Sequence, residues 1–152
     1  MISTATPNEA AFLDMLAGSE GTKGKGNDGY NMIVGGTFFT DYTAHPGVEV
    51  WIPRFQIYSS AAGRYQLLKE YFLPYKALIP VPDFSPDSQD LIALQQIKER
   101  GAQMAVRTGQ FASAISLCCK TWASLPGDPY GQGENSFTRL LSLYQAAGGT
   151  VG

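Results

Sequence analysis

The sequence predicts one α+β domain spanning residues 1–152. Helical patterns of apolar residues occur near both ends of the chain, and residues 30–58 between them shift toward strand-forming types. The length suits a single domain, and hydrophobic residues make up 44% of the chain, which is enough for a packed core. The 17 glycines and 9 prolines indicate many turns.

The first helix is predicted from its start signal. Thr6 is expected at the N-cap, Pro7 at the first helical position, and Glu9 as the side chain that completes a capping box. This helix should present Glu20 at its end. One face is apolar and should pack inward; it contains Phe12, Met15 and Leu16.

A small antiparallel sheet is predicted next. Gly35-Gly36 indicates a hairpin, because glycine tolerates the left-handed conformations of tight turns. The expected strands are Asn31–Val34, Thr37–Thr40 and Val48–Ile52.

Helices are predicted for most of the remaining chain. The first should end before Pro74, and the second should begin with a serine cap and Pro86. The second should bury a stripe of Leu91, Leu94 and Ile97. The four expected helices run from Ser59 or Ser60 to about Phe72, from Ser85 to about Gly101, around 111–122, and from about Asn135 to Ala146.

Composition argues against several classes of function. A net charge of −2 at pH 7 is unlike that of a nucleic-acid-binding protein. No stretch approaches the ~20 apolar residues of a membrane helix, and residues 1–10 do not resemble a signal peptide. Cys118 and Cys119 are adjacent and cannot join distant segments, while the single histidine, His45, has no cluster of ligands around it. We therefore expect neither a disulfide framework nor a metal site.

Glu20 is the main candidate for chemistry. Gly18 and Gly21 bracket it and are expected to bend the backbone there. A carboxyl at this point can be partly buried by the core on one side and open on the other. Partial burial raises a carboxyl pKa, as a general acid that works near neutral pH requires. The alternative is a solvated surface glutamate just past a helix end.

Three further segments combine tyrosines, amides and charged side chains that suit a polyhydroxylated ligand. Aromatic rings stack on sugar faces, and amides both donate to and accept from hydroxyl groups. Tyr65 alone fits a core position as well as a groove position. The candidate substrate-binding residues are Asp41, Tyr42, Arg64, Tyr65, Gln66, Tyr130 and Gln132.

Taken together, these segments closely resemble the lambda-type phage endolysins, which are lysozyme-like lytic transglycosylases that cut bacterial peptidoglycan. The resemblance covers almost the whole chain in order and weakens in residues 47–58, in residues 103–118 and after Gln132. In that family, the region matching residues 47–58 forms a mobile lip. The matching stretches are 11–22, 29–46, 62–68, 83–102, 122–132 and 147–151.

The resemblance implies a lysozyme-like α+β fold with a small antiparallel sheet lobe, a helical lobe and a cleft between them. It implies that Glu20 is the catalytic acid of a bacteriolytic enzyme. That enzyme would cleave the β-1,4 bond between N-acetylmuramic acid and N-acetylglucosamine and leave 1,6-anhydro ends, without a cofactor or metal. It also implies synthesis in the host cytoplasm and action on periplasmic peptidoglycan after a holin-type protein makes a membrane lesion. We expect a monomer that does not insert into membranes.

The number of carboxylates leaves a second mechanism open. A hydrolytic muramidase needs two, about 5–5.5 Å apart when retaining and about 6.5–9.5 Å apart when inverting, so Asp28 or Asp41 would assist Glu20. A lytic transglycosylase needs only one, because the substrate supplies its own nucleophile. A non-catalytic wall-binding protein is a further alternative, which an acid placed at a helix end argues against. A virion-associated enzyme is another, although the lack of an extra domain favours a free endolysin.

Overall fold

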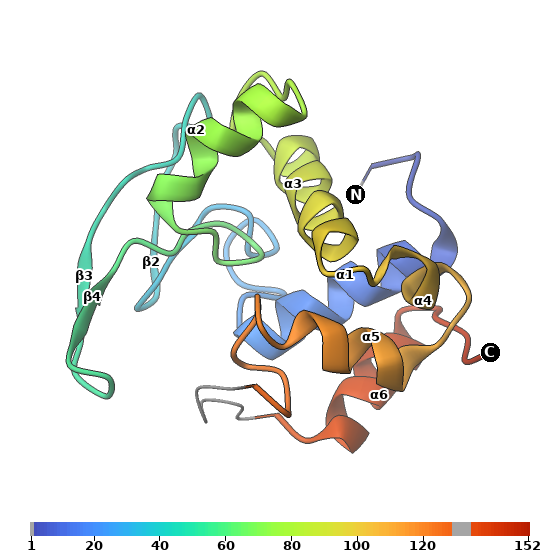
Figure 1. Ribbon diagram of the computed structural model, residues 1–152. Helices are drawn as coiled ribbons and strands as arrows, with labels where there is room; N and C mark the ends of the chain where they lie inside the picture. The colour runs from blue at the N-terminus through green and yellow to red at the C-terminus, as the bar shows by residue number, and fades with distance from the viewer. Residues whose placement is uncertain (1, 129–134) are drawn as a thin grey trace. The chain divides into compact units, whose positions relative to one another are not determined.

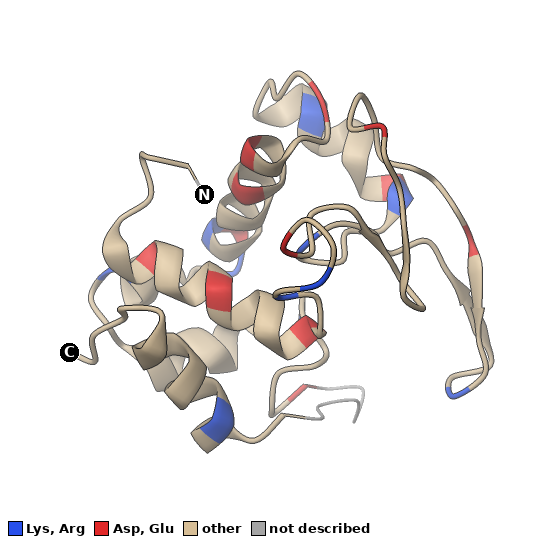
Figure 2. Cartoon of the chain, turned by 180° about the vertical axis from the view of Figure 1, so that it is seen from behind, with Lys and Arg blue, Asp and Glu red and all other residues tan. Residues whose placement is uncertain are grey.

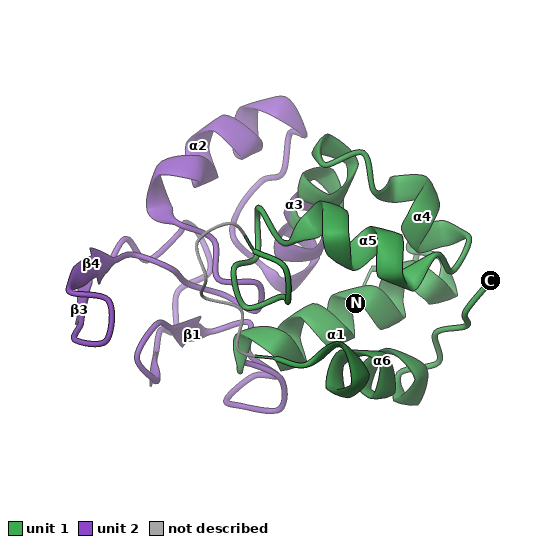
Figure 3. Cartoon of the chain, turned by 60° about the horizontal axis from the view of Figure 1, so that its bottom comes forward, with its two compact units in different colours: residues 1–21, 93–152 green, residues 22–92 purple. Residues whose placement is uncertain are grey.

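The computed structural model describes residues 2–128 and 135–152. Contacts divide the chain into two compact units, coloured separately in Figure 3: unit 1 comprises residues 1–21 and 93–152, and unit 2 comprises residues 22–92. In chain order the elements of Figure 1 are α1 Pro7–Glu20, β1 Met32–Ile33, β2 Thr37–Phe38, β3 Val50–Ile52, β4 Ile57–Ser59, α2 Lys69–Leu78, α3 Pro86–Glu99, α4 Gln103–Arg107, α5 Phe111–Cys118 and α6 Phe137–Ala146.

Helix α1 confirms its predicted start. The Glu9 amide donates to the Thr6 hydroxyl (3.1 Å), and the Thr6 amide donates to the Glu9 carboxylate (3.0 Å), which completes the capping box. Glu20 is the last helical residue. Gly21 follows in the left-handed conformation (φ 79°), where glycine carries no steric penalty.

Unit 1 is a helical layer built around α1, which packs against α6 and α4. The rings of Phe12 and Phe111 meet edge to face, and Phe111 also contacts Tyr144. The sequence predicted a backbone bend at Gly18, but this prediction is wrong, because Gly18 lies within α1. A Cβ atom there would lie 2.7 Å from Cδ1 of Leu143, so the missing side chain lets α6 approach.

Unit 2 contains the two antiparallel ladders found in the described part of the chain, where a single sheet was predicted. The first is the expected hairpin: β1 pairs with β2, and Gly35 and Gly36 form its turn with positive φ. In the second ladder, β3 pairs with β4, a strand that was not predicted from the sequence. The two ladders are separate, and Ile33 of β1 also forms an isolated bridge with Ala62.

The predicted helix from Ser59 or Ser60 to about Phe72 is wrong. Residues 62–67 instead form a tight turn, closed by two backbone hydrogen bonds between Ala62 and Leu67 (3.0 and 2.9 Å). Helix α2 begins only at Lys69, whose amide donates to the Ser60 hydroxyl (3.0 Å), so this serine satisfies a helix start nine residues further on. Pro74 lies inside α2 rather than beyond its end.

The later helices follow the sequence more closely. Helix α3 begins at Pro86 as predicted and stops just before Gly101 (φ 70°). Its buried apolar residues include Ile92 and Ile97, whereas Leu91 is 40% exposed, because polar side chains occupy part of the inward face. Helices α5 and α6 also form where expected.

Several smaller expectations concern the same region. Trp122 is buried but lies beyond the end of α5. Cys118 and Cys119 are both free and buried, and burial raises the pKa of the Cys118 thiol to about 12. Within residues 2–128 and 135–152, no helix combines the length and apolar character needed to cross a membrane.

Candidate active site

Glu20 is a partly buried carboxyl at the C-terminal end of α1. Burial raises its pKa from the ordinary 4.5 to about 7, because removal from water disfavours the charged form, while a hydrogen bond with Ser124 acts in the opposite direction. The expectation of a raised pKa is therefore confirmed. At neutral pH, a substantial fraction of this carboxyl still carries its proton.

The helix itself offers Glu20 no compensating positive charge. The charged residues of α1 are all acidic, and its last turn contains no basic residue. In Figure 2 this helix accordingly carries red bands and no blue ones. The C-terminal end of a helix also carries a partial negative charge from its unpaired carbonyl groups. Helix polarity therefore disfavours ionisation of Glu20, in the same direction as burial.

A polar network in unit 1 surrounds the end of α1. Ser19 and Ser124 share a hydrogen bond between their hydroxyl groups (2.7 Å). The Asn135 amide nitrogen donates to the Ser19 carbonyl (3.0 Å) and the Ser124 carbonyl (3.2 Å), and Arg139 in turn donates to the Asn135 side-chain oxygen. The network ties the last turn of α1 to two segments more than 100 residues away in sequence.

Arg64 and Tyr65 belong to a second network, in unit 2. Both side chains are buried (1% and 5% exposed). Arg64 donates to the Asp28 carbonyl (2.9 Å) and the Asp28 carboxylate (3.2 Å), and also to the Tyr65 hydroxyl (3.2 Å). The hydroxyl groups of Tyr65 and Tyr30 both donate to one carboxylate oxygen of the fully buried Asp90 (2.6 and 3.0 Å).

This network fixes the chain that follows α1. The Thr22 hydroxyl donates to the Arg64 carbonyl (2.6 Å). Gly29 (φ 85°) lies so close to Thr22 that a Cβ atom would approach its carbonyl oxygen to 2.7 Å. Burial, followed by the charge of Asp90, raises the pKa of both Tyr30 and Tyr65, so these phenols remain neutral donors. Arg64 and Tyr65 thus support the backbone from inside unit 2, and their role in substrate binding stays a prediction.

The two carboxylates considered as partners for Glu20 both have local hydrogen-bond donors. Asp28 accepts from the Gly24 amide (2.8 Å) as well as from Arg64, and its backbone is left-handed (φ 48°). Asp41 is exposed, and one of its oxygens accepts from both the amide and the hydroxyl of Thr43 (2.9 and 2.6 Å). These bonds lower the pKa of Asp41, which is therefore ionised at neutral pH.

The other predicted binding residues are less closely grouped. Tyr42 packs on Phe39, and its hydroxyl accepts from the Asn27 amide (2.9 Å). The Gln66 side-chain amide donates to the Gly63 carbonyl (2.9 Å) within the turn 62–67. Tyr130 and Gln132 lie outside the described residues.

Sequence reasoning missed the polar residues that hold Glu20 and Arg64 in place. Asn135 was predicted only as the start of a helix, and Ser124 and Asp90 were not singled out at all. Local spacing gave no signal for them, because each acts through a partner 25 to 116 residues away.

Comparison with known proteins identifies the family of this chain. A model of the endolysin family matches residues 10–151. The chain is 49% identical to the endolysin of Escherichia phage lambda over 93% of this chain and 91% of that one. It is 46% identical to the endolysin of Escherichia phage P2, over 93% of both chains.

Solved structures extend the likeness to the fold. A structure of bacteriophage lambda lysozyme complexed with a chitohexasaccharide superposes with a TM-score of 0.92 at 46% identity and covers 99% of this chain and 100% of that one. A second structure of lysozyme from bacteriophage lambda gives a TM-score of 0.90 at 45% identity, with the same coverage. The α+β fold is thus lysozyme-like, and the chain belongs to the endolysin family, a class of lysozyme-like enzymes that degrade peptidoglycan.

Proposed function

We propose that this chain is a lytic transglycosylase that cleaves the β-1,4 bond between N-acetylmuramic acid and N-acetylglucosamine, with Glu20 as its only catalytic carboxyl. The observation that carries the proposal is the position of Glu20, a partly buried carboxyl at the C-terminal end of α1, where burial raises its pKa to about 7. A general acid is most effective when its pKa lies near the working pH, because it then holds a proton and can still release it.

The hydrogen-bond partners of the other two carboxylates, Asp28 and Asp41, favour a mechanism with a single catalytic acid. Asp28 is engaged by Arg64 and Gly24, and Asp41 is held by Thr43 within its own loop. A retaining or inverting hydrolase needs a second carboxylate aimed at the sugar or at a water molecule. The hydrogen bonds from Thr43 occupy one oxygen of Asp41 and lower its pKa, which makes this carboxylate a weaker base.

The proposed reaction uses Glu20 twice. Its carboxyl group first protonates the glycosidic oxygen, and the bond from C1 of N-acetylmuramic acid to that oxygen breaks through an oxocarbenium-like state. The C6 hydroxyl of the same sugar then attacks C1, while the Glu20 carboxylate accepts the hydroxyl proton and returns to its starting form. The nucleophile is already part of the substrate, so the ring closure has a high effective molarity and consumes no water.

The similar structure of lambda lysozyme supports a glycan as the class of substrate. Lambda lysozyme has been solved with a bound chitohexasaccharide, an oligomer of N-acetylglucosamine. We expect Tyr42, Gln66, Tyr130 and Gln132 to contact the sugar strand, because aromatic rings stack on sugar faces and amides hydrogen-bond to hydroxyl groups. Arg64 and Tyr65 would instead act from within unit 2, because they are buried.

Membership of the endolysin family supports a proposal for the biological setting. We propose that the enzyme acts as a monomer on bacterial peptidoglycan and lyses the host from within. It would be made in the host cytoplasm and would reach the periplasm through a lesion made by a holin-type protein.

Mass spectrometry of the soluble products from purified sacculi tests the reaction. Transglycosylation predicts muropeptides with 1,6-anhydro ends, lighter by one water than hydrolysis products. Reducing ends on N-acetylmuramic acid would instead support the hydrolytic alternative, in which Asp41 or Asp28 serves as the second carboxylate. No release of fragments by folded protein would contradict both mechanisms.

A further inference from the structure

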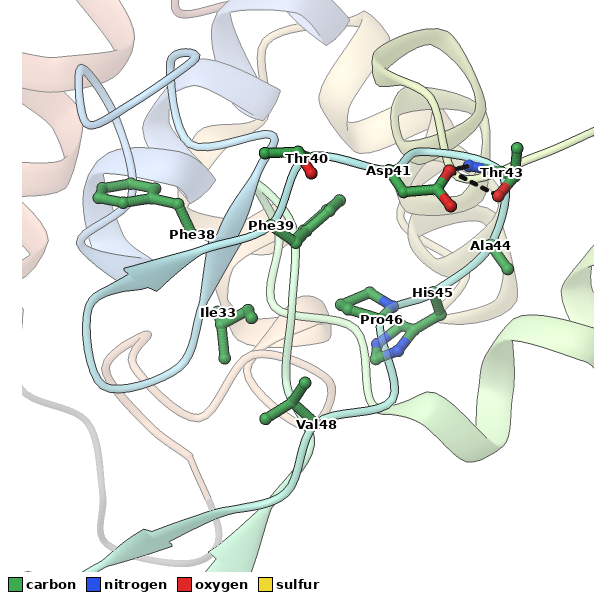
Figure 4. Close-up of a pocket in the computed structure, with 10 residues that line it drawn as sticks. All are labelled: Ile33, Phe38, Phe39, Thr40, Asp41, Thr43, Ala44, His45, Pro46 and Val48. Atoms are coloured by element: carbon green, nitrogen blue, oxygen red, sulfur yellow. Dashed lines mark hydrogen bonds between the residues drawn. The ribbon is translucent and has the colours of Figure 1, made fainter.

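Unit 2 contains a pocket that the single-acid reaction does not use. It is an open cavity of about 510 Å³, formed by β1, β2 and the loop that follows β2, residues 39–48. Figure 4 shows its lining side chains, with Asp41 and Thr43 on one side and the apolar Ile33 and Val48 away from them.

Most of the pocket wall is apolar. Ile33 and Phe39 are buried and belong to the core of unit 2, whereas Phe38 and Val48 are 49% and 45% exposed. Apolar side chains with such exposed surface can be covered favourably by an alkyl chain. The wall thus suits a flexible hydrocarbon segment rather than a group that must be hydrogen-bonded all around.

The pocket carries a negative charge of fixed position. Both Thr43 hydrogen bonds go to the same oxygen of Asp41, Oδ1, and its other carboxylate oxygen has no hydrogen-bond partner among the described residues. The bonds to Thr43 hold the carboxylate in one orientation and favour its ionised form. One oxygen therefore remains available to a ligand.

No positive charge from the lining offsets this carboxylate. The ten lining residues include neither lysine nor arginine. His45 is neutral, because its Nδ1 accepts from the Gly47 amide (3.0 Å) and its Nε2 therefore carries the single proton, which is donated to the Leu67 carbonyl (2.7 Å). Burial also lowers the pKa of His45. Among the ten lining residues, Asp41 is thus the one ionised group, and its charge favours a cation over a carboxylate.

We propose that this pocket binds the side chain of the diamino acid in a peptidoglycan stem peptide, with its ammonium group on Asp41 and its alkyl chain against the apolar lining of the pocket. The inference rests on the proposed function, which makes peptidoglycan the substrate, and it assigns Asp41 to the peptide rather than to the sugar. An amine on a hydrocarbon chain combines the charge and the apolar length that the pocket offers. A stem carboxylate carries a negative charge that Asp41 would repel, and a neutral sugar offers no positive charge to pair with the ionised oxygen.

The binding test uses the intact protein and a small probe. Nα-acetyl-lysine N-methylamide carries one ammonium group on an alkyl chain, and its Nε-acetylated form is a neutral control. Amide resonances of Thr43 and Gly47 report on the pocket, because these groups hydrogen-bond to Asp41 and His45. We expect saturable shifts of both resonances with the amine probe and none with the acetylated probe. Equal shifts with the two probes would overturn the proposal.

A variant pair isolates the charge. Asp41→Asn keeps an oxygen that can accept from the Thr43 amide but removes the negative charge, and Asp87→Asn makes the same change at an exposed site outside the pocket. Binding of the amine probe should weaken about two- to five-fold in Asp41→Asn, as for a solvent-exposed ion pair, and should be unchanged in Asp87→Asn. Undiminished binding in Asp41→Asn would contradict the role of the carboxylate.

An activity measurement connects the pocket to the substrate. Sacculi whose free amines have been acetylated should be cleaved more slowly than untreated sacculi by the natural sequence, and this ratio should approach one in Asp41→Asn. An unchanged ratio between the two proteins would refute the assignment to the stem peptide. Failure of the natural sequence to cleave either substrate would instead count against the proposed function, while the probe titration would still decide whether the pocket binds amines.

Discussion

Glu20 in unit 1 ends helix α1 and Asp41 in unit 2 lies in the loop after β2, and the surroundings of these two carboxyl groups shift their pKa values in opposite directions. Glu20 is partly buried, and the loss of hydration raises its pKa to about 7. Asp41 lies in the open loop after β2, where two hydrogen bonds from Thr43 lower its pKa. The first group is suited to give up a proton, and the second to attract a cation. The comparison shows that hydration and local donors, rather than residue type, decide what a carboxyl can do.

The largest expected effect is the loss of activity on substitution of Glu20, which separates this carboxyl from Asp41. Glu20→Gln removes the transferable proton while keeping nearly the same shape, and it should reduce cleavage of sacculi at least about 100-fold, in line with the contribution of general acid catalysis. Release of soluble muropeptides measures the rate. Glu70→Gln, an exposed change in α2, is the control. Activity retained in Glu20→Gln would remove this residue from the mechanism.

The same substitution should stabilise the protein at alkaline pH. A carboxyl with a raised pKa favours folding while it is protonated, so the stability it contributes is greatest below 4.5 and is lost as pH rises through about 7. Glutamine does not ionise. Glu20→Gln should therefore gain on the order of 2 kcal/mol in free energy of unfolding relative to the natural sequence between about pH 4 and pH 8. Urea unfolding at both pH values measures this gain, and an equal difference at the two would contradict the raised pKa.

The pH dependence of activity gives a finer comparison. Cleavage should decline as pH rises through about 7, because Glu20 then loses the proton it must donate. Ser124→Ala removes the hydrogen bond that lowers this pKa, so the decline should move to higher pH. Ser113→Ala, at an exposed position in α5, should leave the profile in place. A shift toward lower pH in Ser124→Ala would show that this serine favours the neutral acid.

The smallest expected effect concerns the exposed group. Asp41→Asn should lower the rate on intact sacculi by less than about five-fold, because a solvent-exposed charge contributes little to binding. Asp28→Asn, measured beside it, should also leave the enzyme active, because the single-acid scheme gives neither residue a place in the chemistry. A loss in either variant as large as that in Glu20→Gln would indicate a mechanism with two carboxylates.

The two regions also differ in how far the sequence predicted them. Thr6, Pro7 and Glu9 specify the start of α1 through contacts three residues apart, so the position of Glu20 followed from local rules. The conformation of the segment around Arg64 did not follow from local rules. Its apolar spacing resembles a helix, but the bridge between Ala62 and Leu67 and the positive φ of Gly63 and Gln66 produce a turn instead.

The supporting residues of the site lay beyond local pattern reading altogether. Ser124 and Asn135 reach Ser19 across more than 100 residues of chain, and Asp90 meets Tyr65 across 25. Spacing along the sequence carries no information about such contacts, because they form only when folding brings distant segments together. The chemistry of the candidate acid could thus be predicted, whereas the groups that tune and hold it required the structure.

A titration of the side-chain carboxyl carbons by nuclear magnetic resonance tests the central claim most directly, because it reads Glu20 and Asp41 in the same sample. We expect Glu20 to titrate near pH 7 and Asp41 to titrate below its ordinary value of 3.8. Titration of Glu20 near its ordinary value of 4.5 would rule out its role as the acid, because the residue would then be ionised at neutral pH and would have no proton to give the glycosidic oxygen.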